Sequence, residues 1–379
     1  MVFTLHGPHF KHRITQVYLA QALTAISHSL IGIFIPIYLL TLEYTLAQVF
    51  VYFMVHKATV VLVSPVAAYA NHQIGFKKAT LLHIPFFVLS FALLYALSFS
   101  DVHYLLPAIM GGVSIAFYWI PMKTLFIKYS HKKSRGQEVG TLQAIQSMLA
   151  VASPAIGGVI AALLGFPLLI IIGLFLGALA AAPLFFTPEI KAKTSFALKD
   201  LWRIKDHGFM IVTLADGFLF VAIAYLFPLF IYLTLQTTTA VGYIESIGMI
   251  LFALGSFIYG KKLRDPVHAL RVGAVLIAIS LVIRPFLDTA TGFSLVIMFG
   301  ALAGVLYRTG YNTLFVDYGR DLGDTGEEYV VVQEIYLNSG RVIALGLCIL
   351  FPWTWGFFFA AAALVISLAL FTAPSRGTQ

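Results

Sequence analysis

Hydrophobic positions in this chain form long unbroken runs separated by short polar stretches, unlike the one-sided stripe of a soluble amphipathic helix. Twelve runs approach the roughly 20 residues that a helix needs to cross a bilayer. They lie near residues 14–40, 46–70, 79–99, 103–127, 139–162, 166–187, 209–233, 240–260, 267–287, 291–316, 330–350 and 354–373. A membrane barrel would alternate apolar and polar residues instead. The pattern therefore predicts an all-α polytopic membrane protein with twelve transmembrane helices.

Composition supports a bilayer environment, because 60% of the residues are hydrophobic and only 11% are charged. The first apolar run is too long for the core of a signal peptide and has no small-residue cleavage site, so we expect a retained helix. The single cysteine, Cys348, excludes an internal disulfide. We expect an integral protein of the cytoplasmic (plasma) membrane, working as a monomer.

The basic residues predict the orientation. If the N-terminus is cytoplasmic, nineteen of the 24 Lys and Arg residues fall on the inner side and the outer loops carry none. This asymmetry agrees with the positive-inside rule and predicts that both termini are cytoplasmic. The net charge of +8 is then a signal of topology, and no nucleic-acid-binding motif accompanies it. The other five basic residues fall within the apolar runs: Lys57, Lys123, Arg284, Arg308 and Arg341.

The chain also contains an internal repeat with an offset of about 190 residues. The segment 124–129 (TLFIKY) returns as 313–318 (TLFVDY), and Pro36 followed by Ile-Tyr-Leu has a counterpart in Pro228 and 231–233. A parallel duplication in a membrane protein predicts two bundles that move against each other around a central site. We expect an N-terminal six-helix bundle at 1–187, a cytoplasmic linker at 188–208 and a C-terminal six-helix bundle at 209–379.

Two short motifs resemble signatures of the major facilitator superfamily (MFS). The loop that ends Gly75-Phe76-Lys77-Lys78 is similar to the Gly-x-x-x-Asp-Arg-x-Gly-Arg-Arg element, with His72 and Gln73 at its Asp and Arg positions. The segment 153–158 (SPAIGG) is similar to the Gly-Pro-x-x-Gly-Gly element of the fifth helix, and the Arg135-Gly136 dipeptide precedes it as in that family. The resemblance implies the MFS fold of two pseudo-symmetric six-helix bundles.

The resemblance further implies that helices one, four, seven and ten line a central cavity. Polar and aromatic side chains on those helices then become candidate substrate contacts: Gln21, Thr24, His28, Tyr118, Trp119, Tyr307, Arg308, Tyr311 and Asn312. The tyrosines and Trp119 offer stacking or hydrogen bonds, and Arg308 offers a partner for an anionic or carbonyl group. A single histidine such as His28 is more often a packed, hydrogen-bonded residue than a ligand.

Charges inside a membrane are costly and therefore mark functional candidates. A carboxyl group that exchanges a proton as its surroundings change from dry to wet can couple transport to a proton gradient. Asp216, Glu245 and Glu334 are the candidates, with Asp216 and Glu245 favoured. Glu334 shares one helix face with Asn338 and Arg341, which a structural polar stripe would explain as well.

The inner loops of the two halves carry opposite charge. The loop 128–138 is basic, whereas its repeat partner 317–328 is acidic. We expect a cytoplasmic gate in which basic groups of the first half meet acidic groups of the second: Lys77, Lys78, Arg135, Asp317, Glu327 and Glu328. Loops that are solvated independently are the alternative.

No phosphate-binding loop, His-Glu-x-x-His motif, cysteine cluster or nucleophile elbow is present, so the sequence favours no enzyme, cofactor or metal. The leading hypothesis is a secondary active transporter that moves a small organic solute by alternating access, coupled to protons and directed towards efflux of drugs or metabolites. Uptake of a sugar or organic acid is the alternative within transport. A non-transporting membrane protein on a transporter-like scaffold is the alternative from another class.

Overall fold

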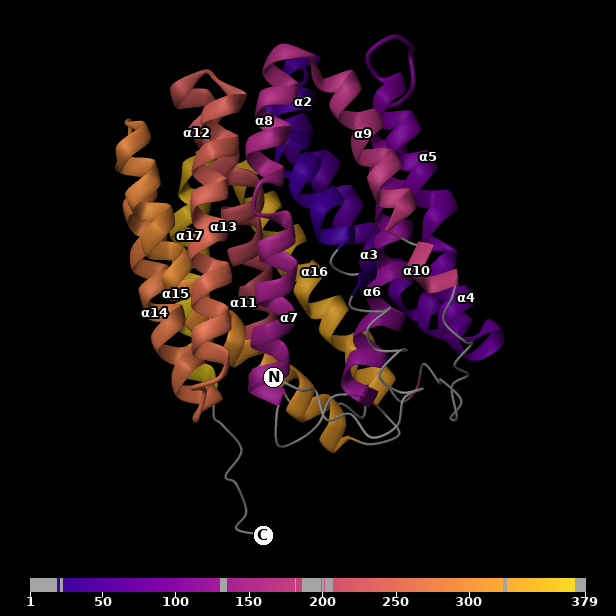
Figure 1. Ribbon diagram of the computed structural model, residues 1–379, viewed down its shortest axis with the longest axis vertical. Coiled ribbons are helices and arrows are strands. Elements are labelled where there is room, and N and C mark those ends of the chain that lie inside the picture. The colour runs from indigo at the N-terminus through magenta and orange to yellow at the C-terminus, as the bar shows by residue number, and fades with distance from the viewer. Residues whose placement is uncertain are drawn as a thin grey trace.

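A computed structural model describes residues 19–20, 23–129, 135–180, 182–185, 199, 201, 207–322 and 326–371. All the regular structure in these residues is helical, and the helices stand side by side in one bundle (Figure 1). The residues that connect the two halves, 188–208, fall mostly outside the described part of the chain, so the predicted domain boundaries stay a prediction.

The described helices of the first half follow the chain up and down the bundle. They are the 3-10 turn η1 (Gly32–Phe34), α2 (Ile35–Thr41), α3 (Leu46–Ile74), α4 (Phe76–Leu81), α5 (His83–Ala96), α6 (Leu105–Tyr129), α7 (Arg135–Ala150), α8 (Ser153–Leu163), α9 (Phe166–Leu179) and α10 (Ala182–Phe185).

The second half repeats this order. It contains α11 (His207–Val221), the π-helical segment η3 (Ala222–Leu226), α12 (Phe227–Leu235), α13 (Thr238–Gly260), α14 (Pro266–Ile283), η4 (Arg284–Phe286), α15 (Ala290–Asp321), α16 (Gly326–Leu350), η6 (Trp353–Trp355) and α17 (Gly356–Leu370).

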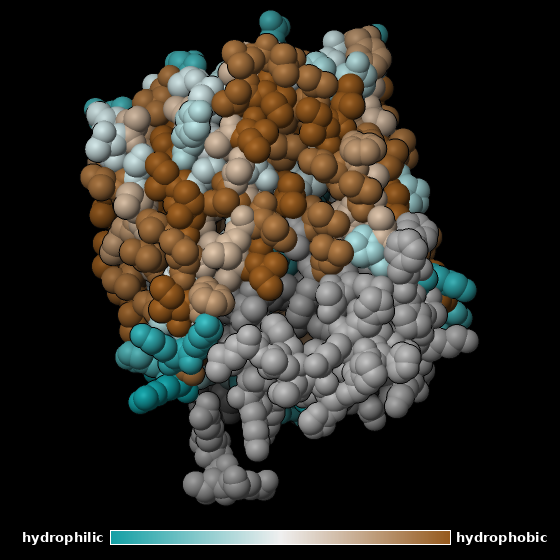
Figure 2. All heavy atoms as spheres, in the orientation of Figure 1, coloured by the Kyte–Doolittle hydropathy of each residue, from teal (hydrophilic) through white to brown (hydrophobic). Residues whose placement is uncertain are grey.

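Ten segments of the described chain are long and apolar enough to cross a membrane. Two further helices complete the predicted twelve. The apolar helix α9 has only 14 residues, and α16 has 25 residues but carries Glu327, Glu328, Glu334 and Arg341. Apolar side chains cover the flank of the bundle in Figure 2, as expected for a surface that faces lipid. The predicted all-α membrane fold is confirmed.

The first and seventh crossings are interrupted at corresponding points. The 3-10 turn η1 precedes Pro36, and the π-helical segment η3 precedes Pro228, so that each proline begins a new α-helix. Proline lacks an amide hydrogen and is tolerated best in the first turn of a helix. The α-helix of the first crossing is therefore interrupted just before Pro36, and its counterpart in the second half fits the internal repeat.

The two halves contact each other along two lines. Helix α3 packs against α16 on one side, and α7 and α8 pack against α13 on the other. Gly242 of α13 lies so close to α8 that an added Cβ would stand 2.2 Å from the carbonyl oxygen of Pro154. The amide of Ala155 donates to Ser246 Oγ at 3.1 Å, because Pro154 has interrupted the helical ladder there. The 153–158 motif thus serves as a contact between the halves.

Candidate transport site

A cavity of about 610 Å³ lies between the two halves. Its lining residues come from the first crossing and from α3, α5, α6, α7 and α9 in the first half, and from α11, η3, α15 and α16 in the second. At one end of the bundle, called here the basic end, α3 meets α4 and α13 meets α14, near Lys77, Lys78, Lys261 and Lys262. The cavity extends from Phe126 towards Leu94 near the opposite end.

Most of the predicted contact residues line this cavity. They are Thr24, His28, Tyr118, Trp119, Arg308, Tyr311 and Asn312. Tyr307 is fully buried and stacks on Tyr311, with ring centroids 6.0 Å apart, but it is not among the lining residues. Gln21 lies outside the described residues.

Two of the three predicted coupling carboxylates line the cavity, and the third does not. Asp216 and Glu334 line it, whereas Glu245 on α13 does not. Glu245 is half-buried elsewhere in the second half, and one of its carboxylate oxygens has no hydrogen-bond partner in the described part of the chain. The sequence favoured Asp216 and Glu245 over Glu334, whereas the structure places Asp216 and Glu334 at the cavity and Glu245 away from it. A role for Glu245 in coupling stays a prediction.

Asp216 forms an ion pair within the second half. Its Oδ2 accepts from Arg308 NH1 at 2.8 Å, which links α11 to α15. The Asp216 side chain is 3% exposed, so this charge depends on Arg308 for compensation. One turn away, the Tyr311 hydroxyl donates to Thr213 Oγ1 at 3.1 Å. The ion pair of Asp216 and Arg308 therefore links α11 of the seventh crossing to α15 of the tenth.

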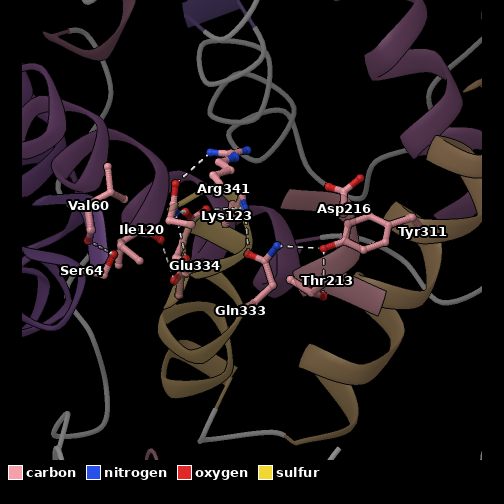
Figure 3. Close-up of polar contacts among 12 residues, drawn as sticks. Val60, Ser64, Ile120, Lys123, Thr213, Asp216, Tyr311, Gln333, Glu334 and Arg341 are labelled. Atoms are coloured by element: carbon pink, nitrogen blue, oxygen red, sulfur yellow. Dashed lines mark hydrogen bonds and ion pairs between the residues drawn. The ribbon is translucent and has the colours of Figure 1, made fainter. Parts of the chain in front are cut away.

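Glu334 forms an ion pair that joins the halves. Lys123 of α6 donates to the Glu334 carboxylate and, at 2.8 Å, to Gln333 Oε1. Gln333 in turn donates to the Tyr311 hydroxyl at 3.0 Å, and Figure 3 shows its amide between Lys123 and Tyr311. Asn338 donates to the other Glu334 oxygen at 2.7 Å. A single polar network therefore runs from α6 through α16 to α15.

Arg341 extends the network towards the aromatic wall of the cavity. Its NH1 donates to Asn338 Oδ1 at 2.9 Å, and its guanidinium lies 3.9 Å from the Phe220 ring centroid. The predicted stripe of Glu334, Asn338 and Arg341 is thus one hydrogen-bonded set, of which Glu334 and Arg341 line the cavity and Asn338 is buried between them. Among the described residues, no group of three or more His, Cys, Asp or Glu side chains is placed to hold a metal ion.

Comparison with known proteins agrees with this architecture. A sequence profile of the Major Facilitator Superfamily matches residues 17–325. The chain belongs to this superfamily. One curated relative, the uncharacterized protein YqgE of Bacillus subtilis (strain 168), is 23% identical over 269 residues. That alignment covers 63% of this chain and 59% of YqgE, less than two thirds of its length.

Solved structures of the superfamily share the fold across nearly the whole chain. The human organic anion transporter MFSD10 (TETRAN) superposes with a TM-score of 0.70 at 14% identity, covering 97% of this chain and all of that one. A bacterial homologue of the iron transporter ferroportin, in its outward-facing state, gives 0.69 at 13% identity, covering 94% and 98%. At this identity the likeness shows that the chain has the MFS fold.

Several residues that form the site were not predicted from the sequence as parts of it. Lys123 stood out as a charge within an apolar run, and Arg341 as part of the polar stripe with Glu334. Gln143 and Gln333 are matching positions of the internal repeat that were not assigned to the site, and His56 was not singled out. Gln143 Oε1 accepts from Thr309 across the halves at 3.3 Å. Polar amides inside predicted crossings are the signal that could have found them, because lipid offers such groups no partner.

At the basic end of this MFS protein, the contacts between the two halves differ in detail from the predicted gate. Glu327 is 4% exposed and accepts from Asn71 Nδ2 at 2.6 Å, and His72 Nε2 lies 2.9 Å from its other oxygen. A carboxylate of the second half therefore contacts the first half at this end, through Asn71 and His72. The pairing of Lys77 and Lys78 with Asp317 or Glu328 stays a prediction, and the Arg135 side chain lies outside the described part.

Replacing Glu327 with glutamine is expected to open the basic end. The neutral amide no longer offers Asn71 and His72 a charged acceptor, and losing one hydrogen bond to a charged group, worth about 1.5–3 kcal/mol, would raise the open population about tenfold or more. In a Cys348→Ser background, a cysteine at Phe126 would report opening by its rate of modification with a membrane-impermeant maleimide. Glu43→Gln, at an exposed carboxylate near the other end, is the control. An unchanged rate in the Glu327 variant would contradict the gate.

Proposed function

We propose that this chain is a proton-coupled secondary transporter that carries a small organic solute by exposing the central cavity alternately to the two sides of the membrane. The observation that carries the proposal is the cavity between two six-helix halves, bridged by the buried pair of Lys123 and Glu334. A site built from both halves changes when the halves rock, which is how repeat-based transporters achieve alternating access.

The contacts at the basic end support two alternating states. Glu327 with Asn71, and Glu334 with Lys123, join the halves through a few polar contacts near one end of the cavity. Breaking a small set of charged contacts costs a few kcal/mol, the scale of free energy that separates alternate conformations. Opening this end would release both contacts and give water access to the cavity.

The two cavity carboxylates support proton coupling. Glu334 and Asp216 are each about 97% buried, and each is paired with one cation. A protonated carboxyl group no longer attracts its cation, so proton binding to Glu334 would weaken the link between α6 and α16. Proton binding and opening would then favour each other by thermodynamic linkage. Proton binding to Asp216 would weaken its pair with Arg308, but both residues belong to the second half, so the link between the halves would not change.

Direction and orientation remain parts of the proposal. The basic residues favour cytoplasmic termini and hence a cytoplasmic basic end. Efflux is the direction expected from the sequence, and uptake of an organic acid is the competing one. Both would use the same cavity and the same pair of states.

Spin-label distances test the proposal without a known substrate. Pairs of labels at Leu82 and Lys262 would span the basic end, and pairs at Phe99 and Asp288 the opposite end, each in a Cys348→Ser background in lipid nanodiscs. We expect two distance populations at each end, with the long basic-end distance paired with the short distance opposite. Lowering the pH should shift both populations, and Glu334→Gln should remove most of that shift. One distance at each end, unchanged from pH 5 to pH 8, would rule out the proposed transporter cycle.

A further inference from the structure

The cavity carries more positive than negative charge. Four cationic side chains line it, Lys57, Lys123, Arg308 and Arg341, against the two carboxylates Asp216 and Glu334. The carboxylates pair with Arg308 and Lys123. Within the described part of the chain, no carboxylate lies within ion-pair distance of Lys57 or Arg341. Two positive charges are therefore left without a carboxylate partner.

These two cations face the same aromatic ring. Phe220, at the end of α11, has Arg341 Cζ 3.9 Å and Lys57 Nζ 5.4 Å from its centroid. Lys57 Nζ is also 5.9 Å from the ring of Tyr225, which stands in the π-helical segment η3. Such segments interrupt α-helices often at functional sites. The ring positions show that the two charges share one part of the cavity.

Besides these two positive charges, this part of the cavity contains buried polar atoms that have no hydrogen-bond partner in the described chain. Lys57 is 5% exposed, and Arg341 uses NH1 for Asn338 while its buried Nε has no partner among the described residues. The neighbouring His56 also lines the cavity, and its Nδ1 has no partner in the described chain. Buried cations and donors are costly when unpaired, and ring faces offset only part of that cost. An anionic ligand with several acceptor oxygens would satisfy them.

The wall beside the cations is aromatic. Phe220 and Tyr225 meet edge to face at 5.4 Å, and Tyr225 stacks on Phe53 with centroids 4.0 Å apart. A flat apolar group can pack on such a surface, while a small inorganic anion would leave it in contact with water. The site therefore combines a place for a negative head group with a place for an apolar body.

We propose that Lys57 and Arg341 bind the anionic group of an amphipathic organic anion whose apolar part packs on Phe53, Phe220 and Tyr225. This assignment rests on the proposed transport function and names its substrate class. Phe53 and Lys57 belong to α3 of the first half, and the other three residues belong to the second half. A bound anion would touch both halves, so its binding free energy can differ between the two states of the cycle.

Calorimetric titration of the purified chain in detergent tests the site. The probe is naphthalene-2-sulfonate, and its neutral match is naphthalene-2-sulfonamide. We expect the intact chain to bind the sulfonate at least about tenfold more tightly, the value of one hydrogen bond to a charged group. Lys57→Met should remove most of this preference, and Lys57→Arg should keep it. Lys262→Met, the same change at an exposed lysine, should leave the ratio unchanged.

Failure of the anion site can be distinguished from failure of the transport cycle. Lys57→Met removes an unpaired buried charge and is therefore expected to fold, and the melting temperature of each variant checks this. Equal affinity for the two probes in the intact chain, or an unchanged ratio in folded Lys57→Met, would overturn the anion site. Sulfonate preference together with a single, pH-independent spin-label distance would instead keep the site and reject the transporter cycle.

Discussion

Replacing Arg308 with glutamine is expected to lower the free energy of unfolding by about 3–5 kcal/mol and to abolish transport. Asp216 is 3% exposed on its side chain, and Arg308 is its one ion-pair partner in the described chain. Without the guanidinium, the carboxylate is left in the interior uncompensated. The change would appear as a fall in the unfolding midpoint in detergent and as loss of naphthalene-2-sulfonate flux into proteoliposomes.

A second change separates stability from function. Asp216→Asn combined with Arg308→Gln removes both charges, and a neutral amide pair of similar volume should restore most of the stability. Transport should stay low, because the charges of Asp216 and Arg308 at the cavity are gone while only Glu334 can still respond to protons. Arg264→Gln, at an exposed arginine, serves as the matched control. A single Arg308 variant as stable as the intact chain would show that the pair is not needed to balance Asp216.

Placing a leucine at Gly242 is expected to force α8 and α13 apart and to abolish transport. A Cβ there would stand 2.2 Å from the Pro154 carbonyl oxygen, and backbone cannot move aside as a flexible side chain does. Overpacking of this kind costs about 1–3 kcal/mol even where the surroundings relax. Because α8 and α13 belong to different halves, relaxation should shift the spin-label distances at the end opposite the basic end.

Gly346 supplies the control for this steric effect. A Cβ at Gly346 meets nothing within 4 Å, so Gly346→Leu should leave the distances and the transport rate close to those of the intact chain. Gly158 faces α13 at the same interface, where its Cβ would lie 2.5 Å from the Thr238 carbonyl oxygen, so Gly158→Leu should repeat the effect of Gly242→Leu. Normal distances in both variants would show that close approach here is not required.

The amino-acid sequence by itself determined the membrane fold. Twelve crossings follow from run length, and the repeat of two halves follows from matching segments at a nearly constant offset, both of which can be read along the chain. The set of membrane charges also follows from the sequence, because any Lys, Arg, Asp or Glu within an apolar run is visible there. The 153–158 motif pointed to the fifth crossing, whose contact with α13 the structure then supplied.

Only the tertiary structure decided which of these charges meet. Asp216 and Glu245 look alike in the sequence, yet Asp216 pairs with Arg308 inside the cavity and Glu245 lies away from it. Likewise Lys123 has a carboxylate partner 211 positions away, and Lys57 has none in the described chain. Ion pairing depends on the rotation of each helix about its axis and on which helix packs beside it. Those are properties of the packed bundle, because no single hydrophobic run records which face its neighbours cover.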